Sequence, residues 1–112
     1  MAERRWTLEA ARALVGDVYQ RTERAVEECQ ALLAERSTAP PGSAELRALD
    51  ERVSAVLERW SGEMEALGLE VKGPWLVDFD TGGGYYCWKW PEKSVDFFHG
   101  YEEGFAGRKR IQ

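Results

Sequence analysis

The chain has 112 residues, a length that fits a single domain with one hydrophobic core. Its formal net charge is -5 at pH 7, and the acidic excess lies in the first 70 residues. Such a surface repels phosphates, so nucleic acid is not an expected partner. The sequence has neither an apolar run of about 18 residues nor a signal-peptide pattern. We therefore expect a cytoplasmic protein that does not contact a membrane.

Two helices are predicted from apolar residues that recur in steps of three and four. The first spans residues 7–36 with Thr7 as its N-cap, and the second spans residues 43–67 with Ser43 as its N-cap. Two prolines and a glycine interrupt the pattern between them. Because the linker is short, the helices are expected to run antiparallel, as a hairpin with a coiled-coil seam.

The apolar stripe of this hairpin is wider than the contact between two helices can cover. Besides the seam positions, it includes Leu14, Tyr19, Val26, Leu33 and Leu57. Exposed apolar patches of this extent are rare on soluble monomers. We therefore expect self-association, and a two-fold homodimer that packs hairpin on hairpin is the simplest arrangement.

After Gly73 and Pro74 the apolar pattern changes to strict alternation, which is typical of strands. Three strands are predicted, at residues 75–79, 84–90 and 94–98, joined as an antiparallel meander. On this pattern Trp88 belongs to the core and shares a sheet face with Phe97.

The predicted fold class is α+β, with a long antiparallel helical hairpin followed by a three-stranded antiparallel β-meander. Residues 1–112 are expected to form one domain. Within it, the hairpin occupies residues 7–67, and the meander with its C-terminal GFAGR tail occupies residues 74–112.

The motifs LVDF, CWKW, FFHG and GFAGR follow one another in this half of the chain. With them, and with the TLEA opening at Thr7, the whole chain resembles the DUF2203 family of small bacterial proteins of unknown function. It departs from the family pattern in two turns, at Asp80 and at Trp90-Pro91-Glu92. The resemblance implies a helical hairpin and no established activity. The matching positions are Asp78, Cys87, Trp88, His99, Gly104, Phe105, Gly107 and Arg108.

Cys87 and His99 are the side chains best suited to chemistry, because a histidine can activate a thiol and both residues can bind metals. With a two-residue turn before the third strand, Tyr86 would face His99. Cys87 and His99 would then point to opposite faces, and only a bulge or a one-residue slip would bring them together. This register argues against a catalytic pair and against a metal site formed by Cys87, His99 and either Asp78 or Asp80. We expect no catalytic residue, no metal and no cofactor.

The GFAGR tail is the best candidate for a ligand site. Its glycines let backbone amides turn toward an anion, and Arg108 adds a planar donor for carboxylate or phosphate. The structural alternative is that Phe105 fills the core, that Arg108 pairs with Asp78 or Glu103, and that His99 donates to a nearby carbonyl or carboxylate. The candidate ligand-binding residues are His99, Arg108, Asp78 and Cys87.

Two functions remain open. The apolar stripe favours a non-enzymatic interaction or structural module that forms homodimers, with an unidentified protein as a further partner. The alternative is a small-ligand or anion-binding site around His99 and Arg108, an enzymatic role included. A concave pocket in which these two residues and a carboxylate converge would favour the second function.

Overall fold

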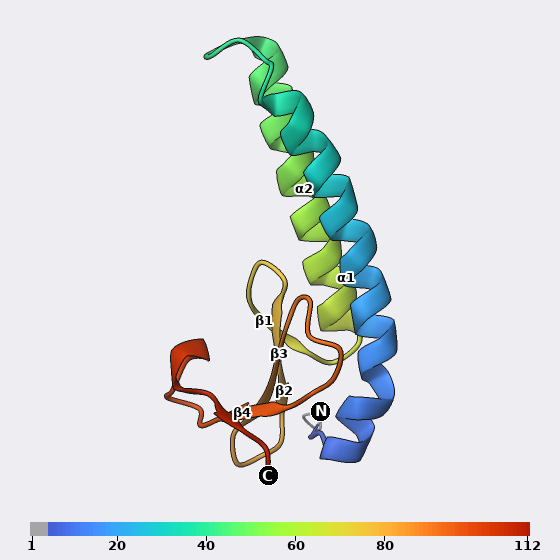
Figure 1. Cartoon of the computed structure of the whole chain (residues 1–112), viewed down its shortest axis with the longest axis vertical. Helices are drawn as coiled ribbons and strands as arrows, with labels where there is room; N and C mark the ends of the chain where they lie inside the picture. Colours follow the sequence, from blue (N-terminus) through green and yellow to red (C-terminus); the bar gives the residue numbers. More distant parts are fainter. Residues whose placement is uncertain (1–4) are drawn as a thin grey trace.

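The computed structural model describes residues 5–112 and begins with a long helical hairpin (Figure 1). Helix α1 spans Leu8–Arg36 and helix α2 spans Ala44–Ala66. Both predicted N-caps are confirmed, because the hydroxyl oxygens of Thr7 and Ser43 accept hydrogen bonds from backbone N–H groups of the first turns.

The two helices pack along a buried seam that includes a polar contact between Trp60 and Thr22. Trp60 is buried, and its indole Nε1 donates a hydrogen bond to Thr22 Oγ1 at 2.8 Å. An ion pair between Arg21 and Glu63, 3.0 Å apart, joins the helices at the flank of the seam. Within residues 5–112, neither helix combines the length and the apolar character needed to cross a membrane.

The second half of the chain forms an antiparallel meander of five strands in the order β1-β2-β3-β4-β5. The α+β class and the order of hairpin and meander are confirmed. The three predicted strands correspond to β2, β3 and β4, and one short strand is added at each edge. The elements are β1 (Glu70–Gly73), β2 (Leu76–Asp80), β3 (Tyr85–Lys89), β4 (Phe97–His99), the 3-10 helix η1 (Phe105–Gly107) and β5 (Lys109–Arg110).

One face of the sheet, the inner face, packs against one end of the hairpin, and the rest of the hairpin extends beyond the sheet (Figure 1). Val77, Phe79 and Trp88 on this face are fully buried. They belong to the same hydrophobic core cluster as Trp60 of α2. The predicted core position of Trp88 is therefore confirmed, and one core joins the helices to the sheet.

The register between β3 and β4 differs by one residue from the prediction. Tyr85 lies opposite His99, and Cys87 lies opposite Phe97. The physical reason is the connection between the strands, which is a loop over residues 90–96 instead of a two-residue turn. Side chains alternate along a strand, so this shift moves His99 and Phe97 from the inner face to the opposite, outer face.

The apolar stripe of the hairpin is partly covered within the chain. Tyr19 packs against Trp90 of the β3–β4 loop, with ring centroids 4.7 Å apart, and its hydroxyl accepts a hydrogen bond from Lys93. Val26 is buried, whereas Leu33 near the tip of the hairpin is 50% exposed. The loop thus covers the stripe beside the sheet and leaves its distal end open.

Candidate functional site

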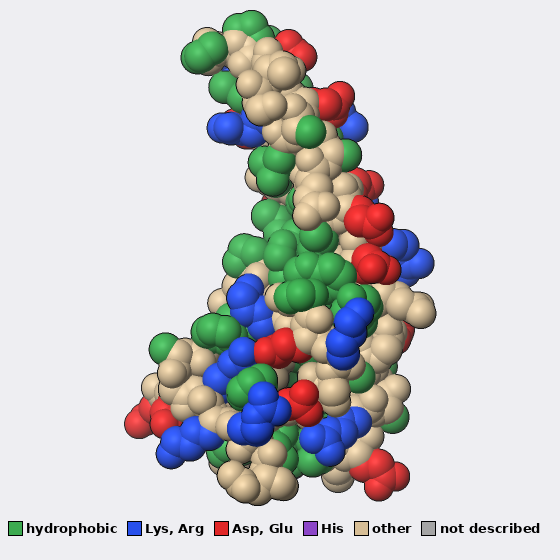
Figure 2. Space-filling view, viewed as in Figure 1, with side chains coloured by type: hydrophobic (Ala, Val, Ile, Leu, Met, Phe, Trp, Pro, Cys, Tyr) green, Lys and Arg blue, Asp and Glu red, His purple; other side chains and the backbone are tan. Residues whose placement is uncertain are grey.

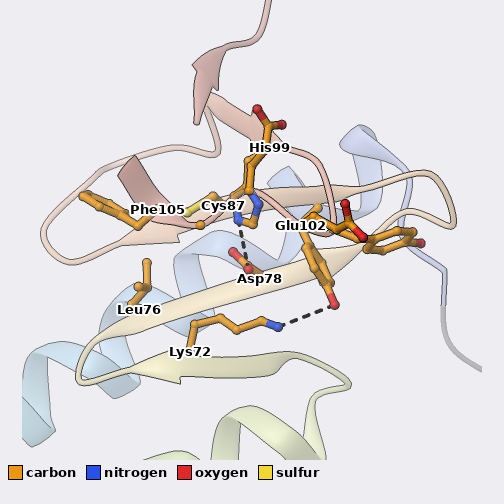
Figure 3. A pocket seen from close by; sticks show the side chains of 11 residues that line it. Lys72, Leu76, Asp78, Cys87, His99, Glu102 and Phe105 are labelled. Carbon is orange, nitrogen blue, oxygen red and sulfur yellow. Dashed lines mark hydrogen bonds and ion pairs between the residues drawn. The ribbon is translucent and has the colours of Figure 1, made fainter. Parts of the chain in front are cut away.

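The outer face of the sheet carries a pocket of about 390 Å³ (Figure 3). Side chains from β2, β3 and β4 form its floor, and the segment over residues 101–105 forms one wall. The floor holds Asp78, Cys87 and His99, which are the three residues that a slip of the predicted register would bring together.

Each floor residue comes from a different strand, and the pairing of the strands explains why they converge. Asp78 on β2 lies directly opposite Cys87 on β3. His99 on β4 lies opposite Tyr85, two residues from Cys87 and therefore on the same face. One oxygen of Asp78, the sulfur of Cys87 and one ring nitrogen of His99 all lie within 4.8 Å of one another. The exposed fractions are 1%, 0% and 4%, so the cluster is shielded from water.

Asp78 and His99 form a buried pair that shares a proton. His99 Nδ1 lies 2.8 Å from the carbonyl oxygen of Gly100, and a carbonyl can only accept, so Nδ1 carries a hydrogen. His99 Nε2 lies 3.0 Å from Asp78 Oδ2, a contact that requires one proton between the two atoms. Burial raises the pKa of the Asp78 carboxyl, and the attraction of His99 opposes this shift.

The second oxygen of Asp78 differs from the first because it lacks an ordinary hydrogen bond. Asp78 Oδ1 is buried and accepts no hydrogen bond of ordinary geometry within the described part of the chain. The thiol of Cys87 lies near the carboxylate as a weak donor, and this contact lowers the pKa of Asp78 against the larger effect of burial. A buried polar atom without a partner costs about 1–3 kcal/mol, and more when it is charged. The cluster therefore holds a destabilising oxygen that a bound cation or donor would satisfy.

Cys87 is a thiol rather than a ready nucleophile. Burial raises its pKa to about 12, the negative charge of Asp78 adds to this effect, and nearby Arg108 opposes it. Nucleophilic cysteines react as thiolates and have lowered pKa values. The geometry that argued against a Cys–His pair is corrected by the observed register, but the electrostatics still disfavour nucleophilic attack by Cys87.

Arg108 lies next to this cluster, and its guanidinium binds a carboxylate and two aromatic rings outside the cluster. Its guanidinium forms two contacts with the Glu92 carboxylate, at 3.1 and 2.6 Å, instead of pairing with Asp78 or Glu103. It also stacks on Phe97 and Phe105, at 3.9 and 4.2 Å from the ring centroids. Phe105 is 39% exposed, so it covers Arg108 and does not fill the core. Arg108 Nη1 lies 3.9 Å from Cys87 Sγ, so Arg108 contacts one residue of the pocket floor.

The rim of the pocket adds groups that the candidate residues do not include. Lys72 Nζ lies 3.1 Å from Glu70 and 3.5 Å from the hydroxyl of Tyr85. Glu102 and Glu103 belong to the opposite wall. Lys72 has no sequence signal as a site residue because β1 is not predicted. The alternation of β3 already places Tyr85 on the face of Cys87, so that residue was within reach of sequence reasoning.

Comparisons with known proteins give the chain a family and no activity. Neither the curated proteins nor the solved structures contain a significant match. The family described as "Uncharacterized conserved protein (DUF2203)" matches residues 4–111. That match covers nearly the whole chain and confirms the resemblance that rests on LVDF, CWKW, FFHG and GFAGR. The chain therefore belongs to the DUF2203 family.

Proposed function

We propose that this protein binds a small, positively charged ligand in the pocket on the outer face of its sheet. The observation that carries the proposal is the buried carboxylate of Asp78, whose Oδ1 lacks a hydrogen-bond partner among residues 5–112. A cation above the floor would satisfy this oxygen and offset the cost of burying it. The volume of about 390 Å³ suits a small molecule or ion.

The charges around the pocket favour a cation over the anion that the sequence suggests. Asp78, Glu102 and Glu103 line the pocket, and the lining includes one lysine, Lys72. That lysine already pairs with Glu70, as Arg108 does with Glu92. An anion would therefore have to break an existing ion pair before it found a free positive charge. A cation meets the carboxylates of Glu102 and Glu103 at the wall of the pocket before it reaches the Asp78–His99 pair at the floor.

The proposal is tested by thermal unfolding of the full chain against a panel of organic ammonium compounds and divalent metal ions, at constant ionic strength. A ligand present at about 100 times its Kd stabilises the fold by about 2.7 kcal/mol, so a binder gives a clear rise in Tm. Asp78→Asn and Glu102→Gln should each reduce that rise. Glu58→Gln, which removes an exposed acid of α2 outside the pocket, is the charge-matched control.

Two results would contradict a cation pocket. The first is a panel in which no cation raises Tm. The second is stabilisation by phosphate or carboxylate compounds that Arg108→Ala abolishes while Asp78→Asn does not. That second result would instead support the anion site around His99 and Arg108.

The second candidate function is self-association through the part of the hairpin that the sheet does not cover. Figure 2 shows hydrophobic side chains gathered where the upper end of the sheet meets the hairpin. Leu33 is half exposed, and Leu57 lines a shallow groove with Val71 and Pro74. A second copy of this chain is the simplest occupant, because one self-complementary surface then serves both copies.

Light scattering at micromolar concentration tests this candidate directly. A dimer mass that Leu33→Glu and Leu57→Glu each reduce to that of a monomer would support it, since a charge in an apolar interface is costly. Tyr19 and Val26 are unsuitable targets because they are packed within the chain. A monomer mass for the unmodified protein would rule the candidate out and leave the pocket as the functional surface.

A further inference from the structure

We propose that the cation at the floor of the pocket is a divalent transition-metal ion of the zinc class, bound by Asp78, Cys87 and His99. This inference rests on the proposed cation pocket and names its ligand. The three residues offer one oxygen, one sulfur and one nitrogen within 4.8 Å of one another. This mixed set of donors suits Zn²⁺, which binds carboxylate, thiolate and imidazole, and not Mg²⁺ or Ca²⁺, which prefer oxygen alone.

The distances need only small adjustments to accept an ion. Zinc bonds of about 2.0–2.3 Å place the ligand atoms of a tetrahedral site about 3.3–3.8 Å apart. His99 Nε2 and Asp78 Oδ2 are now 3.0 Å apart, and the whole cluster spans 4.8 Å. Binding of the ion therefore requires the separations between the ligand atoms to change by about 1 Å. The ion would occupy the position of the proton that Asp78 and His99 share.

Hydrogen bonds around the cluster orient the His99 ring in the way that such bonds orient histidines in metal sites. His99 Nδ1 donates to the Gly100 carbonyl at 2.8 Å, which leaves Nε2 directed into the cluster. A backbone carbonyl on the far nitrogen is a common outer-shell partner of a metal-bound histidine, because it fixes the ring and its tautomer. Asp78 Oδ1, unpartnered within residues 5–112, gives the carboxylate a second oxygen to turn toward an ion.

Charge balance explains how a buried ion is tolerated at this position. Binding of the ion displaces two protons to solvent, the thiol proton of Cys87 and the proton between Asp78 and His99. The resulting thiolate and carboxylate neutralise a doubly charged ion, so the occupied floor has no net charge to bury. Arg108 Nη1, 3.9 Å from Cys87 Sγ, is placed to stabilise the thiolate. The Glu92 carboxylate and the two phenylalanine rings hold the guanidinium there, as described above.

Three protein ligands leave one position of a tetrahedral ion free, and all three of these residues line the pocket (Figure 3). Structural zinc sites are closed by four protein ligands, whereas sites that bind a further molecule keep a position open. Tyr85, Tyr101 and Glu102 line the pocket around this position. The structure thus assigns an open site rather than a structural one.

The experiment uses the full chain, freed of metal by a chelator and then titrated with Zn²⁺ in a calorimeter and with Co²⁺ in a spectrometer. We expect one ion per chain, and a thiolate-to-cobalt charge-transfer band that Cys87→Ser abolishes. Cys29→Ser is the matched control, because Cys29 is the other buried cysteine and lies in the helix seam. Asp78→Asn and His99→Gln should weaken Zn²⁺ binding by more than about 100-fold, since even outer-shell partners contribute about 10–100-fold.

Each outcome supports or overturns the inference. Absence of stoichiometric binding, or loss of the cobalt band in Cys29→Ser as well as in Cys87→Ser, overturns it. Should Cys87→Ser fail to fold by circular dichroism, the folded Asp78→Asn or His99→Gln protein decides through its Zn²⁺ affinity. If organic cations raise Tm through Asp78 while Zn²⁺ and Co²⁺ do not bind, the metal assignment fails and the cation pocket stands. If neither organic cations nor these metal ions bind, the metal assignment and the cation pocket are both wrong.

Discussion

The two faces of the sheet are built from the same strands and are buried for different reasons. On the inner face, Val77 and Trp88 lie opposite each other and pack into the core shared with the helices. On the outer face, Asp78 and Cys87 form the next pair along, and they are equally buried on the face opposite to the one that packs against the hairpin. Apolar burial stabilises a fold, whereas burial of a carboxylate without full hydrogen bonding destabilises it.

The apolar residues of the inner face therefore stabilise the fold, whereas the buried polar residues of the outer face reduce its stability. Residues of the inner face should lose stability when truncated. The buried polar residues of the outer face should be neutral or even stabilising when neutralised, because active and binding sites commonly trade stability for function. Substitutions at neighbouring positions on the two faces can therefore test the assignment of a site.

The largest effect is expected on the inner face, at Trp88. Trp88→Ala should lower the free energy of unfolding by about 3–5 kcal/mol, because the change removes buried aromatic surface and leaves a cavity. It also removes the hydrogen bond from the indole Nε1 to the Glu92 carbonyl. Urea unfolding monitored by far-UV circular dichroism measures the loss. A change below about 1 kcal/mol would show that the inner face does not carry the stability of the sheet.

The hairpin could be predicted almost completely because its signals are local. The caps at Thr7 and Ser43 and the helix bounds follow from residues within one or two turns. The edge strands β1 and β5 were missed because they are only four and two residues long and carry little alternation. Their positions depend on pairing with β2 and β4, which the local sequence does not encode.

The site residues could be identified as candidates from the sequence, but the sequence did not predict that they lie together on one face of the sheet. Asp78, Cys87 and His99 each suggested chemistry, yet the face of His99 depends on the length and shape of the loop before β4. Glu92 shapes that loop: it accepts the backbone N–H of Lys89 on its side chain and the indole N–H of Trp88 on its carbonyl. A one-residue error in the loop reverses every side chain of the next strand, and with it the conclusion about a metal site.

An intermediate effect is expected at Arg108, which joins the outer face to the loop. Arg108→Ala should lower the free energy of unfolding by about 1–3 kcal/mol in the absence of ligand. It leaves Glu92 as a partly buried carboxylate without its partner and removes two ring contacts. Chemical unfolding with a double-mutant cycle against Glu92→Gln isolates the pair. A coupling energy near zero would mean that Arg108 is free to serve a ligand, as the anion hypothesis requires.

The smallest effect, and the one that distinguishes the two faces most sharply, is expected at Asp78. In metal-free protein at neutral pH, Asp78→Asn should raise the free energy of unfolding by about 1 kcal/mol, since it removes a charge whose burial is costly. The asparagine amide can donate to His99 Nε2 while Nδ1 keeps its bond to Gly100, so no charge is left unpaired.

The control is Val77→Ala, at the neighbouring residue on the inner face, which should lower the free energy of unfolding by about 2 kcal/mol because it leaves a cavity. Urea unfolding of both variants with a chelator present gives the comparison. If Asp78→Asn lost as much stability as Val77→Ala, the Asp78–His99 pair would be a structural element of the fold, and the outer face would no longer need a ligand to explain it.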